Sequence, residues 1–283
     1  MVTSLRRFRG RIKPWNVFLA ALTIAGASVI LFPIVWMVFA SIRPTAETLS
    51  SPPVWVPKNI TFRAYHSLLT DSKQLRYFLN SYIIAFSTAG ISVVLGSLAA
   101  YGFSRFRIAG ARLLLTLIFS LQMLPSVSLI IPFFDMSLAL GIHNTRLALI
   151  LADTAFALPI SLWILKSYLD SIPVDLEEAA MVDGCTRLHA LLRVVLPLAL
   201  PGLIGTGTFA FLWAWNEFMF AVVLTTGPDA APLTIAISLF FTQYGRDWSS
   251  IMALNVIATL PLMLLFVFLQ RWVVQGMTAG AVK

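Results

Sequence analysis

Six apolar stretches divide the sequence, and each is about as long as a lipid bilayer is thick. They cover residues 16–42, 77–103, 113–134, 147–165, 194–224 and 251–274. A helix needs roughly 20 apolar residues to cross the hydrocarbon core. Its backbone groups must pair within the segment, because lipid offers them no hydrogen-bond partner. The sequence therefore predicts an all-α, polytopic membrane protein with six transmembrane helices, in one domain that covers residues 1–283.

Composition supports this fold class. Hydrophobic residues make up 59% of the 283 residues, and charged residues make up 11%. An average soluble domain is roughly 45–50% apolar and about 25% charged. The composition excludes an ordinary soluble enzyme and a disordered tail, and a single cysteine, Cys185, excludes a disulfide scaffold. The sequence also lacks catalytic motifs and the His or Cys spacing of a metal site, so neither is expected.

Lysine and arginine residues predict which loops face the cytoplasm, because cytoplasmic loops of membrane proteins collect them. With a cytoplasmic N-terminus, the inner side holds 13 of the 20 basic residues: Arg6, Arg7, Arg9, Arg11, Lys13, Arg105, Arg107, Arg112, Lys166, Arg187, Arg193, Arg271 and Lys283. We therefore expect both termini in the cytoplasm, and segments 43–76 and 225–250 outside. The net charge of +8 is attributed to these loops and not to a nucleic-acid partner.

The basic N-terminus and the first apolar stretch also resemble a secretory signal peptide. Signal peptides have an apolar core of about 7–15 residues, whereas residues 16–42 form a longer run. An uncleaved first transmembrane helix is expected in preference to a cleaved leader.

The inner segment between the fourth and fifth stretches, residues 166–193, predicts two short helices. Pro173 suits the first turn of a helix. Three acidic residues then lie near the positive end of the helix dipole: Asp175, Glu177 and Glu178. Gly184 can adopt the left-handed conformation that ends a helix, and Thr186 is an N-cap for the second one.

A compact, acidic helix that carries Ala179 and Ala180 suits docking into a groove of a soluble partner, because small side chains allow close approach. A surface helix that only joins two spans would have the same composition. The residues alone leave both interpretations open.

A spaced pattern runs through this segment into the next apolar stretch. Its members are Glu178-Ala179-Ala180, Gly184 after three intervening residues, Val194, Leu196-Pro197 and Pro201. The pattern resembles the EAA loop of ABC-importer permeases of the carbohydrate branch. Residues 213–218 and 275–283 resemble the maltose-type second permease subunit, and the resemblance covers nearly the whole chain. Cys185 is a mild departure, since Ala or Ser is usual there.

This resemblance implies the ABC importer type I permease fold and a sugar substrate, for example a disaccharide such as trehalose. The partners that it implies are a second homologous permease subunit, a dimer of a cytoplasmic ABC ATPase, an extracytoplasmic sugar-binding protein or lipoprotein, and the lipid of a bacterial cytoplasmic membrane. The chain has no G-x-x-x-x-G-K-[ST] phosphate loop. It is therefore expected to be a transport subunit and not an enzyme, without a cofactor of its own, while ATP and Mg²⁺ bind the partner ATPase.

The resemblance also assigns roles to residues of the loops and the tail. Glu178 is the polar contact to the ATPase, Ala179 and Ala180 pack closely against it, and Asp183 and Gly184 end the helix. In the C-terminal tail, Thr278, Gly280 and Lys283 are expected to reach the ATPase, although a frayed terminus is the alternative. Outside, Gly227, Pro228 and Asp229 are expected to contact the binding protein.

Five polar residues within the spans are candidates for the substrate pathway, because polar groups in lipid are costly and often functional. They are Asn80, Gln122, Asp153, Asn216 and Glu217. One interpretation is a lining that forms hydrogen bonds with sugar hydroxyls. The other is polar bonding between helices or a position near the headgroups, and both stay open for each residue.

An ion-coupled secondary transporter is the alternative function. It requires ionisable residues paired near the midplane, or unwound half-helices there. Asp153 is a weak candidate for such a site. An uptake that depends on an ion gradient and not on ATP would identify this class.

Overall fold

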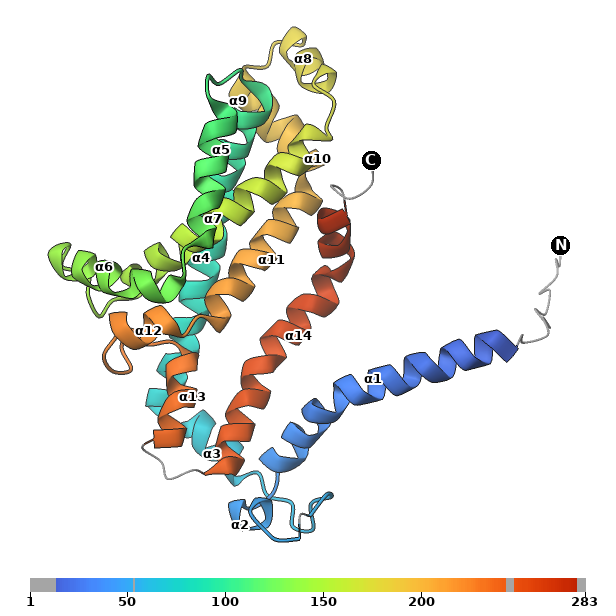
Figure 1. The fold of residues 1–283 in the computed structure, drawn as a ribbon, viewed down its shortest axis with the longest axis vertical. Helices are drawn as coiled ribbons and strands as arrows, with labels where there is room; N and C mark the ends of the chain where they lie inside the picture. The colour runs from blue at the N-terminus through green and yellow to red at the C-terminus, as the bar shows by residue number, and fades with distance from the viewer. Residues whose placement is uncertain (1–13, 53, 243–246, 279–283) are drawn as a thin grey trace.

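The computed structural model describes residues 14–52, 54–242 and 247–278, and these ranges form helices and loops without a strand (Figure 1). The helices are α1 (Pro14–Ser41), α2 (Thr45–Thr48), α3 (Arg63–Thr70), α4 (Ser72–Arg105), α5 (Ala111–Ser120), α6 (Ser126–Ala139), α7 (Arg146–Asp170), α8 (Asp175–Val182), α9 (Arg187–Ala190), α10 (Leu196–Leu198), α11 (Leu200–Asn216), α12 (Met219–Leu224), α13 (Leu233–Thr242) and α14 (Trp248–Thr278). A 3₁₀ turn (Leu121–Met123) follows α5, and a π turn (Leu191–Val195) links α9 to α10.

The expected six spans are present, but only four are continuous helices: α1, α4, α7 and α14. The other two are helix pairs, each of which counts as one bent span. The all-α membrane fold is therefore confirmed, and the third and the fifth of the six apolar stretches form broken helices.

The third stretch bends by 98° between the helical segments Ala111–Met123 and Ser126–Ala139. Pro125 causes the break, because a proline drives the residue before it out of the helical region. Leu124 is accordingly extended, with φ −72° and ψ 129°. As a result α6 leaves the axis of α5 and projects to the side of the molecule (Figure 1).

The fifth stretch breaks twice. It bends by 78° between the helical segments Arg187–Leu198 and Leu200–Asn216, and Pro201 lies in the first turn of α11, where its missing N–H needs no helical partner. It ends again at Glu217, which is extended with φ −65° and ψ 133°. The expected single helix over 194–224 is therefore a π turn, a short α10, α11 and a separate α12.

Helices α4, α7 and α11 form the centre of the molecule, and small residues let them approach closely. A Cβ at Gly96 of α4 would lie 3.3 Å from the Ser161 Cβ of α7, and a Cβ at Gly207 of α11 would lie 3.3 Å from Val93 of α4. Such contacts are typical of membrane helices, where association depends on close packing and not on water exclusion. This centre fixes the relative position of the two ends of the molecule.

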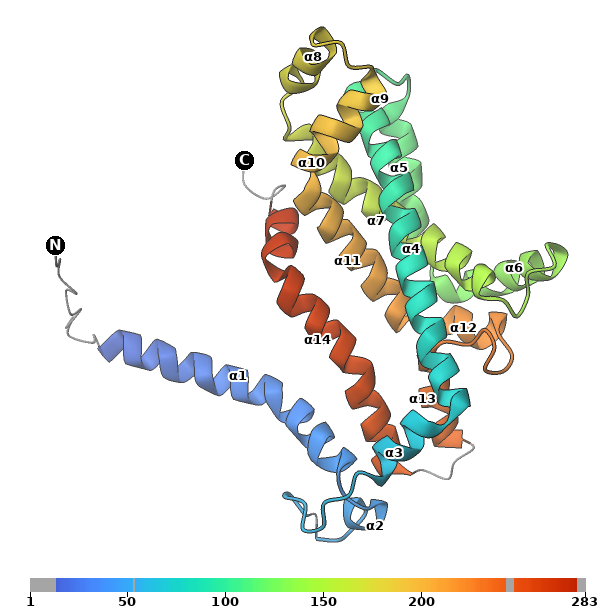
Figure 2. The same cartoon turned by 180° about the vertical axis from the view of Figure 1, so that it is seen from behind.

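The loops gather at two opposite ends (Figures 1 and 2). Helices α8 and α9 form one end, together with the end of α4 and the start of α5. The end of α1, α2, α3 and the start of α14 form the other. Helix α3 lies within the segment 43–76 and buries Ala64 and Leu68. The segments expected inside and outside therefore lie at opposite ends.

Helix α1 leans away from the rest of the chain (Figure 1). It packs mainly on α14, and its most apolar 18-residue window is 0% buried. Its side chains are apolar along its whole length, and Ile24, Val29 and Ile30 are strongly exposed. The surface of α1 therefore faces lipid or another protein.

Candidate functional site

Helix α8 forms at one end of the molecule as the sequence predicts. Its first turn carries the three acidic residues, and Gly184 follows with φ +94° in the left-handed region. The hydroxyl of Thr186 then accepts a hydrogen bond from the backbone N–H of His189 and starts α9. Both predicted short helices and the predicted N-cap are therefore confirmed.

The outer surface of α8 is small, acidic and partly apolar. Glu178, Ala179, Asp183 and Gly184 are exposed, and Ala180 is half-buried. Val182, the last residue of α8, is 87% exposed. Four of the five residues assigned to coupling are thus exposed, and the fifth, Ala180, is partly exposed.

Glu177 points the opposite way from Glu178 and is 2% exposed. Its Oε2 accepts a hydrogen bond from Arg105 Nε at 3.1 Å, and its Oε1 accepts one from the Tyr101 hydroxyl. Sequence reasoning missed this role. Neighbouring residues on a helix differ by about 100° in direction, so adjacent glutamates can have different surroundings, and only the packing shows that Glu177 is the buried one.

Arg105 connects the coupling segment to the end of α4 through a second bond. Its Nη2 donates to the backbone oxygen of Ile172 at 3.0 Å. The Phe106 ring next to it contacts the Tyr101 ring, and the Arg187 guanidinium of α9 lies 5.4 Å from the centre of the Phe106 ring. The C-terminal end of α4 is therefore bonded to both short helices.

Asp153 and Glu217 lie deep in the membrane-spanning part. Asp153 on α7 is 1% exposed, and its Oδ1 has no hydrogen-bond partner within the described ranges. Glu217 lies at the break between α11 and α12. The Glu217 carboxylate accepts hydrogen bonds from the N–H groups of Phe220 at 2.7 Å and Ala221 at 3.0 Å, and so starts α12.

The other two pathway candidates in this region are bonded to nearby backbone. The Gln122 amide nitrogen donates to the Phe156 oxygen of α7 at 2.8 Å. Asn216 is exposed and donates to the Leu212 oxygen of its own helix at 2.7 Å. Gln122 therefore helps to hold the bent third span against α7, whereas Asn216 contacts only α11.

An aromatic cluster lies beside Asp153, one turn further along α7. The Phe156 ring is stacked on Trp213 with ring centres 6.1 Å apart, and it contacts Phe220 and Phe133 as well. Trp213 remains 37% exposed. Hydrogen-bond acceptors and flat apolar faces thus occur close together in this region, with Asp153 buried and Trp213 partly exposed.

Asn80 of α4 is fully buried and all its polar atoms are bonded within the chain. Its amide nitrogen donates to the oxygens of Pro228 at 2.9 Å and Ala231 at 2.8 Å. Its Oδ1 accepts from Arg146 Nε at 2.8 Å. This geometry favours the interpretation of polar bonding between elements for Asn80.

The loop after α12 carries the three residues assigned to the binding protein. Gly227 has φ +88° and is exposed, as is Asp229, while Pro228 is half-buried. Asp229 pairs with Arg76 at the start of α4, and both side chains are exposed. The loop is thus held to α4 from within, with its tip accessible.

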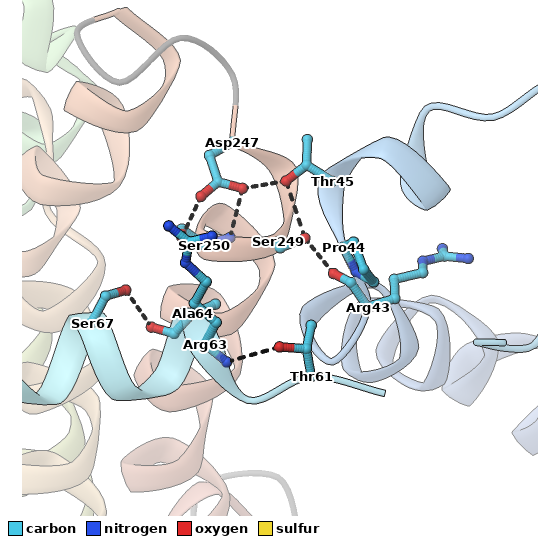
Figure 3. Close-up of a pocket in the computed structure, with 10 residues that line it drawn as sticks. All are labelled: Arg43, Pro44, Thr45, Thr61, Arg63, Ala64, Ser67, Asp247, Ser249 and Ser250. Atoms are coloured by element: carbon cyan, nitrogen blue, oxygen red, sulfur yellow. Dashed lines mark hydrogen bonds between the residues drawn. The ribbon is translucent and has the colours of Figure 1, made fainter. Parts of the chain in front are cut away.

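A cavity of about 630 Å³, drawn in Figure 3, lies between the end of α1, α2, α3 and the start of α14, which is the end opposite α8 in Figure 1. It is lined by Arg43, Pro44, Thr45, Thr61, Arg63, Ala64, Ser67, Asp247, Ser249 and Ser250. Burial raises the pKa of the Asp247 carboxyl, but hydrogen bonds from Ser250 and Thr45 outweigh burial and hold this pKa below its ordinary value. No sequence motif marks this cavity, because it joins segments about 200 positions apart.

The C-terminal tail is only partly described. Thr278 is the last residue of α14. Gly280 and Lys283 lie outside the described residues, so their expected contact with an ATPase remains a prediction.

Comparison with known proteins follows this geometry. Residues 92–279 match the family described as "Binding-protein-dependent transport system inner membrane component". The chain is 39% identical over 260 residues to the trehalose/maltose transport system permease protein MalG of Thermococcus litoralis, covering 91% of this chain and 93% of the relative. It is 36% identical over 253 residues to the sulfoquinovosyl glycerol transport system permease protein SmoH of Agrobacterium fabrum, covering 89% of each.

The fold is also similar to a solved structure. A chain of a bacterial ABC transporter that imports the acidic polysaccharide alginate matches with a TM-score of 0.78 and 23% identity, covering 93% of this chain and 98% of the other. At this identity the likeness supports the fold. Family match, close relatives and fold agree that this chain is a transport permease subunit and not an enzyme, and that it belongs to the family of binding-protein-dependent transport system inner membrane components.

Proposed function

We propose that this chain is the membrane-spanning permease subunit of an ATP-driven importer that moves a sugar into the cytoplasm by alternating access. The exposed α8 carries the proposal: an acidic, small-residue helix projects at one end of the molecule, although the chain has no phosphate-binding loop of its own. Energy therefore enters from a partner ATPase that binds ATP and Mg²⁺ and holds α8.

The coupling surface consists of Glu178, Ala179, Ala180, Asp183 and Gly184. Its exposure supports contact with an ATPase groove, in which Glu178 provides charge and the alanines allow close approach. The exposed Val182 adds apolar area to the same contact. The tail residues Thr278, Gly280 and Lys283 are further contacts to the same ATPase in this proposal.

The orientation follows from the charges. Both termini and α8 lie in the cytoplasm, and segments 43–76 and 225–250 lie outside, because this arrangement puts most Lys and Arg residues inside. The membrane is the bacterial cytoplasmic membrane. An extracytoplasmic binding protein or lipoprotein docks outside, where Gly227 and Asp229 at the accessible loop tip are its contacts together with Pro228.

The second permease subunit covers α1. This helix is long enough to span the bilayer, yet none of its most apolar 18-residue stretch is buried by the rest of the chain. A homologous subunit packed on α1 and on the projecting α6 would complete the pathway. A photo-crosslinker at Ile24, which is 67% exposed, is expected to capture that subunit.

The sugar pathway passes Asp153 and Glu217 and the rings beside them. The free Oδ1 of Asp153 offers an acceptor to a sugar hydroxyl, and Trp213 offers a flat face. The relatives named for trehalose/maltose and sulfoquinovosyl glycerol transport differ in their sugars. We infer a disaccharide such as trehalose as the substrate of this chain.

The single cysteine gives a direct test, because Cys185 lies directly after α8 and is half-buried. The chain is co-expressed with its sister permease, ATPase and binding protein, and maleimide labelling of Cys185 is measured in membranes with and without the ATPase. We expect the ATPase to protect Cys185 and the Glu178→Ala variant to lose part of that protection. Equal labelling in both membranes would contradict the proposed docking.

Transport in proteoliposomes tests the energy source. Labelled trehalose is supplied together with the binding protein outside the vesicles. Uptake is expected only when ATP is present in the lumen, on the same side of the membrane as the ATPase. Uptake that a protonophore abolishes and that ATP does not affect would identify the ion-coupled alternative. A panel with maltose and diacetylchitobiose then defines the sugar.

A further inference from the structure

Among the described ion pairs, the one between Arg105 and Glu177 is distinct in its burial. The Arg105 and Glu177 side chains are 5% and 3% exposed. The other two described pairs, Arg76–Asp229 and Lys166–Asp170, lie at the surface with larger exposed fractions. Surface pairs contribute little because water screens them, whereas removal of one partner from a buried pair leaves an uncompensated charge.

The position of this pair gives it a mechanical consequence. Helix α8 is joined to the spans by a short connection on either side, and it stands at the tip of the molecule (Figure 2). Glu177 is the residue of α8 that turns inward, and Arg105 is the last residue of α4. The same guanidinium donates a hydrogen bond to the Ile172 oxygen, just before α8. The end of α4 is therefore bonded both to α8 and to the segment that leads into it.

Helix α4 extends from this grip to the opposite end of the molecule. It has 34 residues without an internal proline and is about 51 Å long at 1.5 Å per residue. Near its other end, Asn80 holds the Pro228 and Ala231 oxygens of the outer loop. One continuous helix is thus bonded to the coupling segment at one end and to the outer loop at the other.

We propose that Arg105, Glu177 and Tyr101 are positioning residues that make α8 and α4 move as one body. A displacement of α8 by the ATPase is then delivered to α4, and through Asn80 to the loop that faces the binding protein. This inference rests on the proposed docking of α8 to an ATPase. Energetic coupling between distant sites can be carried by a rigid helix whose two ends are hydrogen-bonded to the segments that move.

The geometry requires arginine at position 105. A planar guanidinium can donate to the Glu177 carboxylate through Nε and to the Ile172 oxygen through Nη2 at once. A lysine carries the charge as a single point and cannot reproduce this fork. Arg105→Lys is therefore expected to retain part of the function and Arg105→Gln to lose it.

The experiment compares Glu177→Gln, Arg105→Gln, Arg105→Lys and Tyr101→Phe in the full complex in proteoliposomes. Two quantities are measured: labelled trehalose imported per ATP hydrolysed, and maleimide labelling of Cys185 without the ATPase. Asp170→Asn is the matched control, because Asp170 also bonds to α4, through Ser104, but lies in an exposed pair.

We expect sugar imported per ATP to fall about 10-fold in Glu177→Gln and Arg105→Gln, a typical size for coupling between two sites. Cys185 labelling is expected to rise in both, because α8 loses its hold on α4. Arg105→Lys and Tyr101→Phe are expected to shift both quantities in the same direction by less. The control is expected to match wild type.

Two results would overturn the inference. Unchanged import per ATP in Arg105→Gln and Tyr101→Phe, with Cys185 protected by the ATPase in wild type, would reject the link while the docking of α8 stands. Unprotected Cys185 in wild type would reject the docking itself. If a charge-removing variant fails to insert, Tyr101→Phe keeps the test, since it removes one hydroxyl and retains the ring.

Discussion

Gly202 lies where α11 crosses α7, and no larger residue fits there. A Cβ at this position would lie 2.8 Å from Tyr168 Cγ and 3.0 Å from Tyr168 Cβ, the part of that side chain that cannot swing away. The sequence marks Gly202 as one of several glycines and prolines in this stretch, but hydropathy does not reveal which glycine touches a neighbour. Only the packing of the two helices separates Gly202 from the others.

Gly202→Ala is therefore expected to destabilise the protein by about 1–3 kcal/mol, because overpacking forces helix α7 or α11 to shift. The thermal unfolding midpoint of the detergent-purified protein measures this. Gly90→Ala in α4 is the matched control, since a Cβ there meets nothing within 4 Å. Equal midpoints for the two variants would contradict the expected contact.

Gly184 is constrained by its backbone and not by its neighbours. Its φ is +94°, and a Cβ there would meet nothing within 4 Å. Gly184→Val is expected to destabilise the turn that ends α8 by about 1–2 kcal/mol, because residues with a β-carbon disfavour the left-handed conformation. Sugar uptake should fall although the protein still inserts in the membrane.

Gly184→Asn separates this cause from loss of space. Asparagine tolerates the left-handed region better than valine, so its uptake should lie closer to that of wild type. Uptake by Gly184→Val equal to that of wild type would show that the turn at residue 184 is dispensable for coupling.

At the scale of elements, the sequence predicts that a helix is present better than it predicts where that helix is interrupted. The α8 helix, its glycine stop and the Thr186 cap follow from local chemistry, and the structure confirms them. Pro125 marks the break at Leu124 already in the sequence, whereas the break at Glu217 has no such mark, because an apolar run does not show where its hydrogen bonds end. The outer cavity and the ion pair between Arg105 and Glu177 each join segments that are distant in the sequence, so no local sequence pattern could reveal them.

The separate helix α12 depends on Glu217, whose carboxylate accepts two of its free N–H groups. Glu217→Ala is expected to cost about 0.5–2 kcal/mol, in the range for loss of a helix cap. Hydrogen exchange of the Phe220 and Ala221 amides should accelerate. Glu217→Gln retains an acceptor oxygen and should change less; unaltered exchange in Glu217→Ala would contradict the capping role.

At the scale of the whole molecule, α4 links events at the two ends. Asn80 and Arg105 lie 25 residues apart on one helix, or about 38 Å. Substitutions this far apart normally have independent, additive effects. Departure from additivity is therefore the signature that distinguishes a connecting helix from two unrelated local sites.

A double-mutant cycle of Asn80→Ala with Glu177→Gln is expected to be non-additive in binding-protein-stimulated ATP hydrolysis. Once either end is released, releasing the other should add little. The coupling energy should fall within about 0.5–3 kcal/mol. Asn80→Ala with Asp170→Asn is the reference pair and should be additive, and additivity in both cycles would remove α4 from the transmission path.

The exposure of α1 has a consequence for how the cell must make this protein. Its own chain leaves the apolar surface of this spanning helix unburied, so the surface is open to contact with another subunit. With the sister permease proposed above as its cover, a copy made alone exposes this apolar surface to membrane proteases and to unrelated helices. The proposal therefore predicts that the cell makes the two permeases in balanced amounts.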